Sequence, residues 1–164
     1  MGQVFIVNGW GGVGKSTFEN CCWECGVEPV FLRSMADRPK RQALLSGWNG
    51  EKDDAWRELI ATIKRATEKY NPDFLIMKMV ELVIGHDCNF CTTFIDARET
   101  RDIEELKKRL NAKTILVTNN RVKCPNCESD RNIKLDGYDY VIENNGTLDD
   151  LKQKAKEFME GING

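Results

Sequence analysis

The chain has 164 residues, of which 24 are basic and 26 acidic, so its formal net charge is −2. This length suits one domain with a continuous core, and the charge balance argues against a uniformly basic nucleic-acid binder. The longest apolar stretch, FLIMKMVELVIG, is too short to span a bilayer and contains Lys78 and Glu81. The first residues lack the basic start of a secretory signal. We therefore expect a cytoplasmic protein without membrane or nucleic-acid partners.

Short apolar runs alternate with amphipathic stretches along the whole chain. The runs are typical of buried parallel strands, and apolar residues spaced three or four apart indicate helices. This alternation predicts a three-layer α/β/α fold around a five-stranded parallel sheet. In chain order, we expect strand 3–8, helix 15–25, strand 28–34, helices 37–47, 53–70 and 71–85, strand 90–97, helix 98–111, strands 112–119 and 138–144, and helix 147–162.

Two of these helix starts involve a proline. Asn71 is expected to cap the helix that ends at Gly85, with Pro72 as the first helical residue. In the stretch DRPKRQ, Pro39 either belongs to the first turn of its helix or breaks that helix.

The stretch GWGGVGKST, between the first strand and the first helix, fits the pattern G-x-x-x-x-G-K-[S/T] at every position. Glycines let backbone N–H groups point at a phosphate, and the helix start adds partial positive charge. We expect Lys15 to bridge the β- and γ-phosphates, Ser16 to bind Mg²⁺ and Thr17 to reach the α-phosphate. The sequence thus predicts an ATP–Mg²⁺ site formed by Gly9, Gly11, Gly12, Val13, Gly14, Lys15, Ser16 and Thr17.

Charged residues follow the strand TTFID at the sheet edge where the phosphate loop is expected. Asp96 ends this strand and is a candidate second Mg²⁺ ligand, although an ordinary strand-end aspartate is the alternative. Arg98 and Arg101 come next, and they can neutralise charge on a transferred phosphoryl group. The other interpretation is that both arginines are solvated residues of a first helical turn.

A long polar segment, about 119–136, separates the last two strands and carries Arg121, Lys123, Arg131 and Lys134. We interpret it as a lid that closes over phosphates and excludes water, with Arg121 and Arg131 near the reacting group. A plain surface loop is the alternative.

Other uses of a phosphate loop have less support. The stretch TNNR stands where a GTPase would carry N-K-x-D, and no motif of a motor or transporter ATPase is visible. A small-molecule kinase is the best remaining class.

With these motifs, the sequence resembles the nucleoside monophosphate kinase group of phosphate-loop proteins. The resemblance is closest to bacterial and phage deoxynucleoside monophosphate kinase-like, or adenylate kinase-like, proteins. It spans most of the chain and rests on NGWGGVGKST, LLSGWNGEKDDAWRELIATIKRATEKYN, FIDARETRDIEELKKRLNAKTILVTNN and SDRNIKLDGYDYVIENNGTLDDLKQKAKEFM. It implies one kinase domain over 1–164 that transfers phosphate from ATP to a nucleoside or deoxynucleoside monophosphate.

The resemblance also implies where the two substrates bind. Residues 144–147 would border the adenine, with Asn145 and Gly146 in contact with it. The acceptor would bind over the region 34–85, where Trp48 or Trp56 is available to stack a base, through Arg33, Ser34, Asp37 and Arg41. Two alternatives stay open: a kinase of another small acceptor, such as dephospho-coenzyme A, and a nucleotide-binding protein with negligible turnover.

Three C-x-x-C pairs account for six of the seven cysteines: Cys22/Cys25, Cys88/Cys91 and Cys124/Cys127. The third pair follows its expected strand, whereas the second precedes its strand and the first ends a helix, so in a parallel sheet the third pair lies at the opposite edge and a four-cysteine zinc lid is not expected. A structural Zn²⁺ held by the first two pairs is one interpretation, and free thiols are the other.

Overall fold

The computed structural model describes residues 2–51, 53–85, 90–123 and 136–163. The chain forms two compact units, of which the first joins Met1–Arg33 to Asp87–Gly164 and the second is Ser34–His86. The second unit covers almost the same residues as the region 34–85, which we expect to bind an acceptor.

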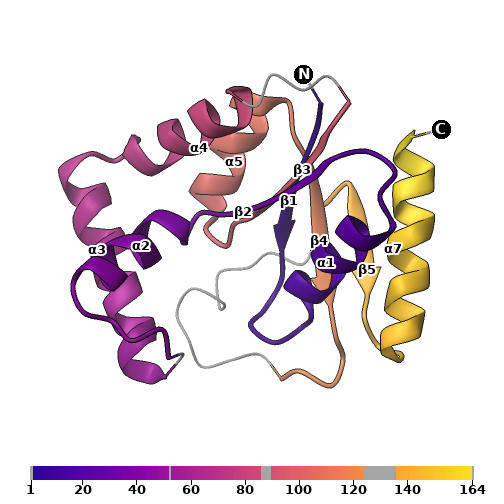
Figure 1. Ribbon diagram of the computed structural model, residues 1–164, viewed down its shortest axis with the longest axis horizontal. Coiled ribbons are helices and arrows are strands. Elements are labelled where there is room, and N and C mark those ends of the chain that lie inside the picture. Colours follow the sequence, from indigo (N-terminus) through magenta and orange to yellow (C-terminus); the bar gives the residue numbers. More distant parts are fainter. Residues whose placement is uncertain (1, 52, 86–89, 124–135, 164) are drawn as a thin grey trace. The chain divides into compact units, whose positions relative to one another are not determined.

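A five-stranded parallel sheet forms the centre of the fold, as the sequence predicted (Figure 1). Its strand order is β2-β3-β1-β4-β5, so β1 is central and its carboxyl end lies between those of β3 and β4. The strands are β1 (Gln3–Asn8), β2 (Val30–Ser34), β3 (Thr92–Asp96), β4 (Lys113–Thr118) and β5 (Tyr140–Glu143). Segments that follow β1, β3, β4 and β5 therefore share one edge of the sheet.

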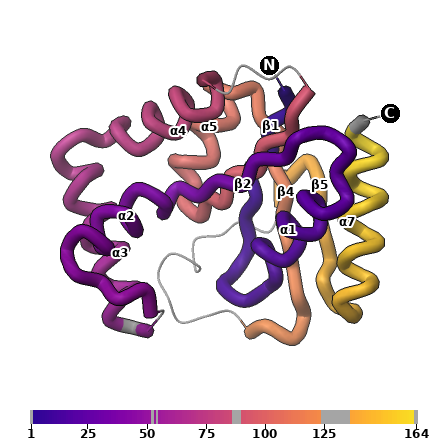
Figure 2. The backbone as a smooth tube through the Cα atoms, viewed as in Figure 1, coloured from indigo at the N-terminus to yellow at the C-terminus, as the bar shows by residue number. Residues whose placement is uncertain are grey.

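Helices cover both faces of this sheet. Helix α1 (Lys15–Cys25) packs side by side with α7 (Leu148–Asn163), and both contribute to the core on one face (Figures 1 and 2). Helix α5 (Thr100–Leu110) also contacts β1. The predicted three-layer architecture is confirmed.

Four phenylalanines from separate elements form the centre of the core between the sheet and the pair α1 and α7. Phe5 of β1 lies against Phe94 of β3 with ring centroids 5.7 Å apart, and against Phe158 of α7 at 5.1 Å. Phe18 of α1 meets Phe158 at 5.7 Å. Burying such large apolar rings supplies much of the free energy that holds helix and sheet together. The start of α1, which follows the phosphate loop, is thereby anchored to the sheet.

The second unit consists of three helices: α2 (Asp37–Leu45), α3 (Asp54–Tyr70) and α4 (Phe74–Ile84). Asp53 caps α3, because its carboxylate accepts a hydrogen bond of 2.7 Å from the backbone N–H of Trp56. Pro39 lies in the first turn of α2, where no intrahelical N–H bond is lost, so the helix continues through it.

The predicted start of α4 is wrong by two residues, since the helix begins at Phe74 and not at Pro72. The N–H of Asn71 donates to the carbonyl of Thr67 at 2.8 Å, so Asn71 completes the end of α3. Asp73, and not Asn71, precedes the first helical residue of α4, so the chain uses two more residues to turn between the helices.

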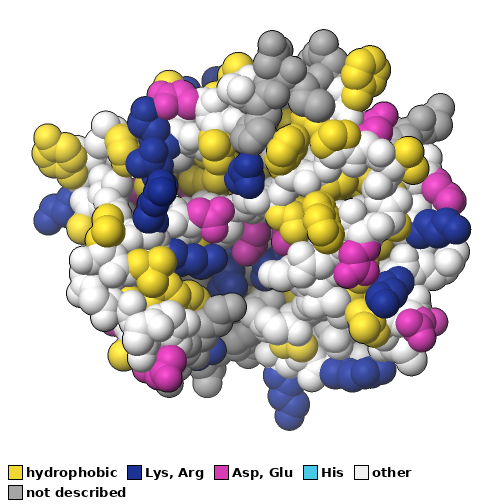
Figure 3. Space-filling view, viewed as in Figure 1, with side chains coloured by type: hydrophobic (Ala, Val, Ile, Leu, Met, Phe, Trp, Pro, Cys, Tyr) yellow, Lys and Arg dark blue, Asp and Glu magenta, His cyan; other side chains and the backbone are white. Residues whose placement is uncertain are grey.

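No helix in the described part of the chain combines the length and apolar character needed to cross a membrane. The most apolar of them, α4, has 11 residues, whereas a bilayer span needs about 20. On the face drawn in Figure 3, basic and acidic side chains are interspersed, in keeping with the near-neutral net charge.

Candidate functional site

The loop between β1 and α1 has the backbone that its glycines allow. Gly9, Gly12 and Gly14 have φ values of 143°, 84° and 98°, in the region that residues with a Cβ resist. A Cβ on Gly9 would lie within 3.0 Å of the Val117 carbonyl oxygen, and one on Gly14 within 3.0 Å of the Asn144 amide nitrogen. Glycine is thus required at these two positions by close contact as well as by dihedral angle.

Lys15, the first residue of α1, directs its ammonium group into this loop. Its side chain is buried, and Nζ donates to the carbonyl oxygens of Gly9 at 2.8 Å and Trp10 at 3.1 Å. Because the helix N-terminus adds its own partial positive charge, the loop is an electropositive cradle. Such a cradle suits a phosphate group.

Asp96 and Ser16 have the chemistry of a magnesium site. Asp96 pairs in register with Val7, whose side chain belongs to the core beneath α1, so both side chains point to the α1 face. The Oδ1 atom of Asp96 is buried, and it has no hydrogen-bond partner among the described residues. Ser16, the second residue of α1, is exposed. Mg²⁺ prefers oxygen ligands, and a buried carboxylate oxygen that lacks a donor suits a cation. The residues present therefore fit Mg²⁺.

Two asparagines hold the phosphate loop at its two ends. Asn8 is 1% exposed, and its Oδ1 accepts a hydrogen bond of 2.7 Å from the N–H of Gly9. Asn144 donates from Nδ2 to the Val13 carbonyl at 2.9 Å, while its own N–H donates to Thr118 at 2.7 Å. Sequence analysis did not single out Asn8, although a polar residue that ends the apolar run QVFIVN is a signal for it.

The loop after β5, which we expect to border adenine, is bonded to the segment after β4. Arg121 donates from Nη2 to the Asn145 carbonyl at 2.6 Å, and the N–H of Asn120 donates to Asn145 Oδ1 at 2.9 Å. The structure thus brings together Arg121 and Asn145, two predicted site residues. A Cβ on Gly146 would lie within 3.0 Å of the Asp150 carboxylate, so a larger residue there would have to displace that side chain from Thr147, to which it is hydrogen-bonded.

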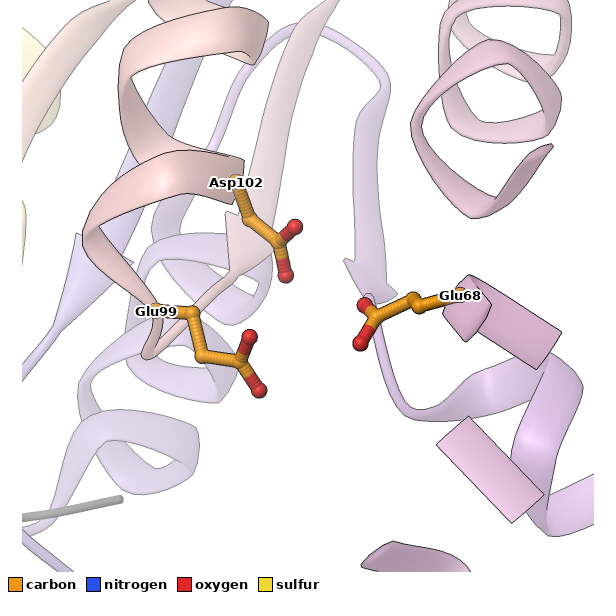
Figure 4. A group of neighbouring side chains, drawn as sticks. All are labelled: Glu68, Glu99 and Asp102. Carbon is orange, nitrogen blue, oxygen red and sulfur yellow. The ribbon is translucent and has the colours of Figure 1, made fainter. Parts of the chain in front are cut away.

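The segment that joins β3 to α5 carries the other predicted arginines. Arg98 and Arg101 are both exposed there, and Glu99 and Asp102 alternate with them. Figure 4 draws these two carboxylates at the start of α5, together with Glu68 from α3 of the second unit. Glu99 and Asp102 lie at a helix start, where the helix dipole stabilises acidic groups, and Glu68 belongs to the other unit, so we assign no metal to the three carboxylates. Arg131 lies outside the described residues, as do Lys134 and most of the predicted lid.

The side chains of Ser34 and Asp37, two predicted acceptor residues, both accept hydrogen bonds from backbone N–H groups at the start of α2. The N–H of Ser34 donates to Asp37 Oδ2 at 2.8 Å, and Ser34 Oγ accepts from the N–H of Ala36 at 3.2 Å. Arg33, in the first unit, donates from Nη1 to the Leu32 carbonyl at 3.0 Å and lies over the Phe31 ring.

A pocket within the second unit lies between the start of α2 and helix α4. Arg38 and Lys78 line it, whereas the predicted Arg41 does not. Arg38 lies 5.4 Å from the Phe74 ring centroid, and Lys78 pairs with Glu81. Arg41 was expected from the family resemblance; which arginine of α2 lines the pocket depends on tertiary packing, which the sequence does not display. The lining residues are Ser34, Met35, Asp37, Arg38, Leu75, Lys78, Met79 and Leu82.

The two tryptophans suggested for base stacking pack against each other. The ring centroids of Trp48 and Trp56 are 5.5 Å apart, and Trp48 Nε1 donates to the Glu51 carbonyl at 2.8 Å. Their packing orders the segment that leads into α3.

The described cysteines are free thiols, and those of α1 are poor nucleophiles. Cys22 is fully buried, and this burial raises the pKa of its thiol far above the usual range; Cys25, Cys21 and Glu19 add to the shift. Burial also raises the pKa of Cys25. Cys88, Cys124 and Cys127, named in the zinc hypothesis, lie outside the described residues.

Comparison with known proteins adds evidence on the fold. No family model matches the chain, and no curated protein matches it. Among solved structures, an APS kinase from Mycobacterium tuberculosis is similar at 11% identity over 97% of each chain, with a TM-score of 0.56. The chain has the fold of the P-loop kinases.

Two further structures support this assignment. A Thermus thermophilus protein is similar at 17% identity over 99% of each chain, with a TM-score of 0.57. A shikimate kinase from Acinetobacter baumannii, solved with shikimate, is similar at 11% identity over 99% of this chain and 93% of its own, with a TM-score of 0.55. At such low identity, these similarities establish the P-loop kinase fold and leave the acceptor to be inferred from the residues of this chain.

Proposed function

We propose that the chain binds ATP with Mg²⁺ at the phosphate loop and transfers the γ-phosphoryl group to a nucleoside or deoxynucleoside monophosphate. The observation that carries this proposal is the buried ammonium of Lys15 inside the glycine loop, together with Asp96 at the end of the neighbouring strand β3, whose Oδ1 has no hydrogen-bond partner among the described residues. A triphosphate bound in the loop would replace the Gly9 and Trp10 carbonyls as the partner of Lys15.

The side chains of the site would act mainly by positioning and by neutralising charge. In this scheme Ser16 and Asp96 hold Mg²⁺, which screens the phosphate oxygens when it is bound. Arg98, Arg101, Arg121 and Arg131 are proposed to stabilise charge on the transferring group. Glycine N–H groups hold the remaining phosphate oxygens.

The pocket of the second unit supports an anionic acceptor. Arg38 and Lys78 bring two cationic groups to it, and Met35, Leu75 and Met79 give it apolar walls. A nucleoside monophosphate combines a phosphate for such cations with a base for such walls. We propose that this pocket receives the acceptor through Ser34, Asp37 and Arg38; Arg33 and Arg41, which the sequence resemblance also implied, are not among its lining residues.

A second candidate function is phosphorylation of a different small acceptor. The similar structures include a shikimate kinase, so this fold also accommodates acceptors that are not nucleotides. A nucleotide-binding protein with negligible turnover is the remaining alternative.

The experiment that tests the proposal measures ADP release from Mg-ATP with each common ribo- and deoxyribonucleoside monophosphate. Lys15→Ala serves as the inactive variant, and Lys156→Ala, which removes an exposed ammonium on α7, is the matched control. We expect one or a few acceptors to raise the rate well above the background without acceptor, and only Lys15→Ala to abolish this gain.

Other outcomes would separate the alternatives. ATP binding without acceptor-dependent turnover would contradict the nucleoside monophosphate assignment and would favour another acceptor or a binding role. Turnover that needs no acceptor would identify an ATPase instead.

A further inference from the structure

The buried side chain of Asn8 is held from both ends. Its Oδ1 accepts the N–H of Gly9 at 2.7 Å, and its Nδ2 donates to the hydroxyl of Tyr138 at 2.7 Å. With 1% of its surface exposed, Asn8 has almost no access to water. A buried amide that lost either partner would be left unsatisfied, so this arrangement is stabilised as a whole.

The orientation of this amide follows from its partners. The N–H of Gly9 can only donate, so the group that faces it must be the carbonyl oxygen of Asn8. The amide nitrogen therefore faces Tyr138, whose hydroxyl oxygen accepts. The Gly9 N–H thus sets the orientation of the Asn8 amide, and the Tyr138 hydroxyl, which accepts from Nδ2, holds the other end of that amide in place.

Gly9 is the first residue of the phosphate loop, and its backbone N–H and carbonyl oxygen bond to different side chains. Its N–H is bonded to Asn8, and its carbonyl oxygen is bonded to Lys15 Nζ at 2.8 Å. If Lys15 moves to a phosphate, the hydrogen bond from its Nζ to the Gly9 carbonyl is lost, while the bond from the Gly9 N–H to Asn8 Oδ1 remains. The link through Asn8 to Tyr138 is then what keeps the start of the loop in place.

We infer that Tyr138 is a positioning residue for the phosphate loop, which it controls through Asn8 and the N–H of Gly9. This inference rests on the proposed function, because it assumes that the loop binds a triphosphate. Burial raises the pKa of Tyr138, opposed by its hydrogen bond with Asn8, so the hydroxyl stays protonated at neutral pH. The residue therefore acts as a neutral hydrogen-bonding group and not as an acid or base.

The test compares Tyr138→Phe with Tyr140→Phe. Each variant loses one hydroxyl, but the hydroxyl of Tyr140 accepts a hydrogen bond of 3.4 Å from Lys113 Nζ at the start of β4, away from the phosphate loop. Isothermal titration with Mg-ATP should show about a fivefold weaker Kd for Tyr138→Phe, the size of one lost hydrogen bond, and an unchanged Kd for Tyr140→Phe. The Kd for inorganic triphosphate with Mg²⁺ should rise by the same factor, because the loop contacts only the phosphates.

A double-mutant cycle separates positioning from a general loss of stability. Asn8→Ala should weaken ATP binding at least as much as Tyr138→Phe, and the double variant should be no weaker than Asn8→Ala alone. Additive effects, or a loss for ATP without a loss for inorganic triphosphate, would overturn the inference.

The proposed function has its own control in the same titration. If the wild type binds no ATP, or binds it as tightly as Lys15→Ala does, the proposed function fails. If the wild type binds through Lys15 and Tyr138→Phe binds equally well, only the inference about Tyr138 is wrong.

Discussion

Replacing Gly14 by alanine should destabilise the protein more than the same change at Gly12. Both glycines have positive φ, 98° and 84°, which costs an alanine about 1–2 kcal/mol. The stiffer unfolded chain offsets about 0.4–1 kcal/mol of this cost at each position. Among the described residues, a Cβ on Gly12 meets nothing within 4 Å, so Gly12→Ala should lower the free energy of unfolding by only about 1 kcal/mol.

At Gly14 the new Cβ would lie within 3.0 Å of the Asn144 amide nitrogen. That amide donates to the Val13 carbonyl at 2.9 Å, and moving it away should cost about 1 kcal/mol more. We therefore expect Gly14→Ala to lower the free energy of unfolding by about 2 kcal/mol in total.

Urea denaturation followed by circular dichroism measures both variants, with equal m-values as the check that only stability has changed. The Asn144 contact accounts for the difference between them, so adding Asn144→Ala to each variant should bring the two midpoints together. Equal losses for Gly12→Ala and Gly14→Ala would show that Asn144 does not hold the loop.

Three further predictions concern other parts of the chain. Because Arg38 lines the pocket, Arg38→Ala should raise the KM for the acceptor about tenfold and leave the KM for ATP unchanged in steady-state kinetics. Arg41→Ala, on the same helix, should raise the acceptor KM less, and equal effects of the two variants would contradict the role of Arg38. Burial raises the pKa of Asp139, but hydrogen bonds from Thr114 and Lys107 outweigh burial and hold this pKa below its usual value of 3.8. The stability that the ionised Asp139 adds is therefore present above pH 3.8 and is lost as the pH falls through the lowered pKa. The free energy of unfolding of wild type should thus exceed that of Asp139→Asn near pH 6 by more than at about pH 3, and a constant difference would refute it. Because burial raises the pKa of its thiol, Cys22 should resist iodoacetamide near pH 8 in the native protein and react only after unfolding. Mass spectrometry measures the labelling, and native labelling as fast as that of a free thiol would contradict this prediction.

The sequence predicted the sheet well because each strand is a local apolar run. The phosphate loop was predictable for a similar reason, since Gly9, Gly14 and Lys15 lie within seven consecutive positions. Local spacing determines both features, and local spacing is what a sequence displays directly.

The contacts that hold the loop were not predictable in this way. Asn8 and Tyr138 are separated by 130 positions, and Val13 and Asn144 by 131. Which side chain of α2 lines the pocket, Arg38 or Arg41, depends likewise on how α2 packs on α4. The start of α4 was missed because Asn71 ends the preceding helix and Asp73 precedes α4. Either residue type suits the position before a helix, so the local sequence does not distinguish between them.

The hydrogen bonds that Asn144 makes to Val13 and Tyr138 makes to Asn8 also bear on the order of folding. Asn144 and Tyr138 flank β5, the last strand to be synthesised, while the loop they hold follows the first. Contacts between such distant segments form late, because a long stretch of chain must be ordered before they close. A nascent or partly folded chain therefore has its glycine motif long before it has the hydrogen bonds that shape it. Nucleotide should stabilise only the completed sheet, and so it would trap the native protein without accelerating the steps that lead to it.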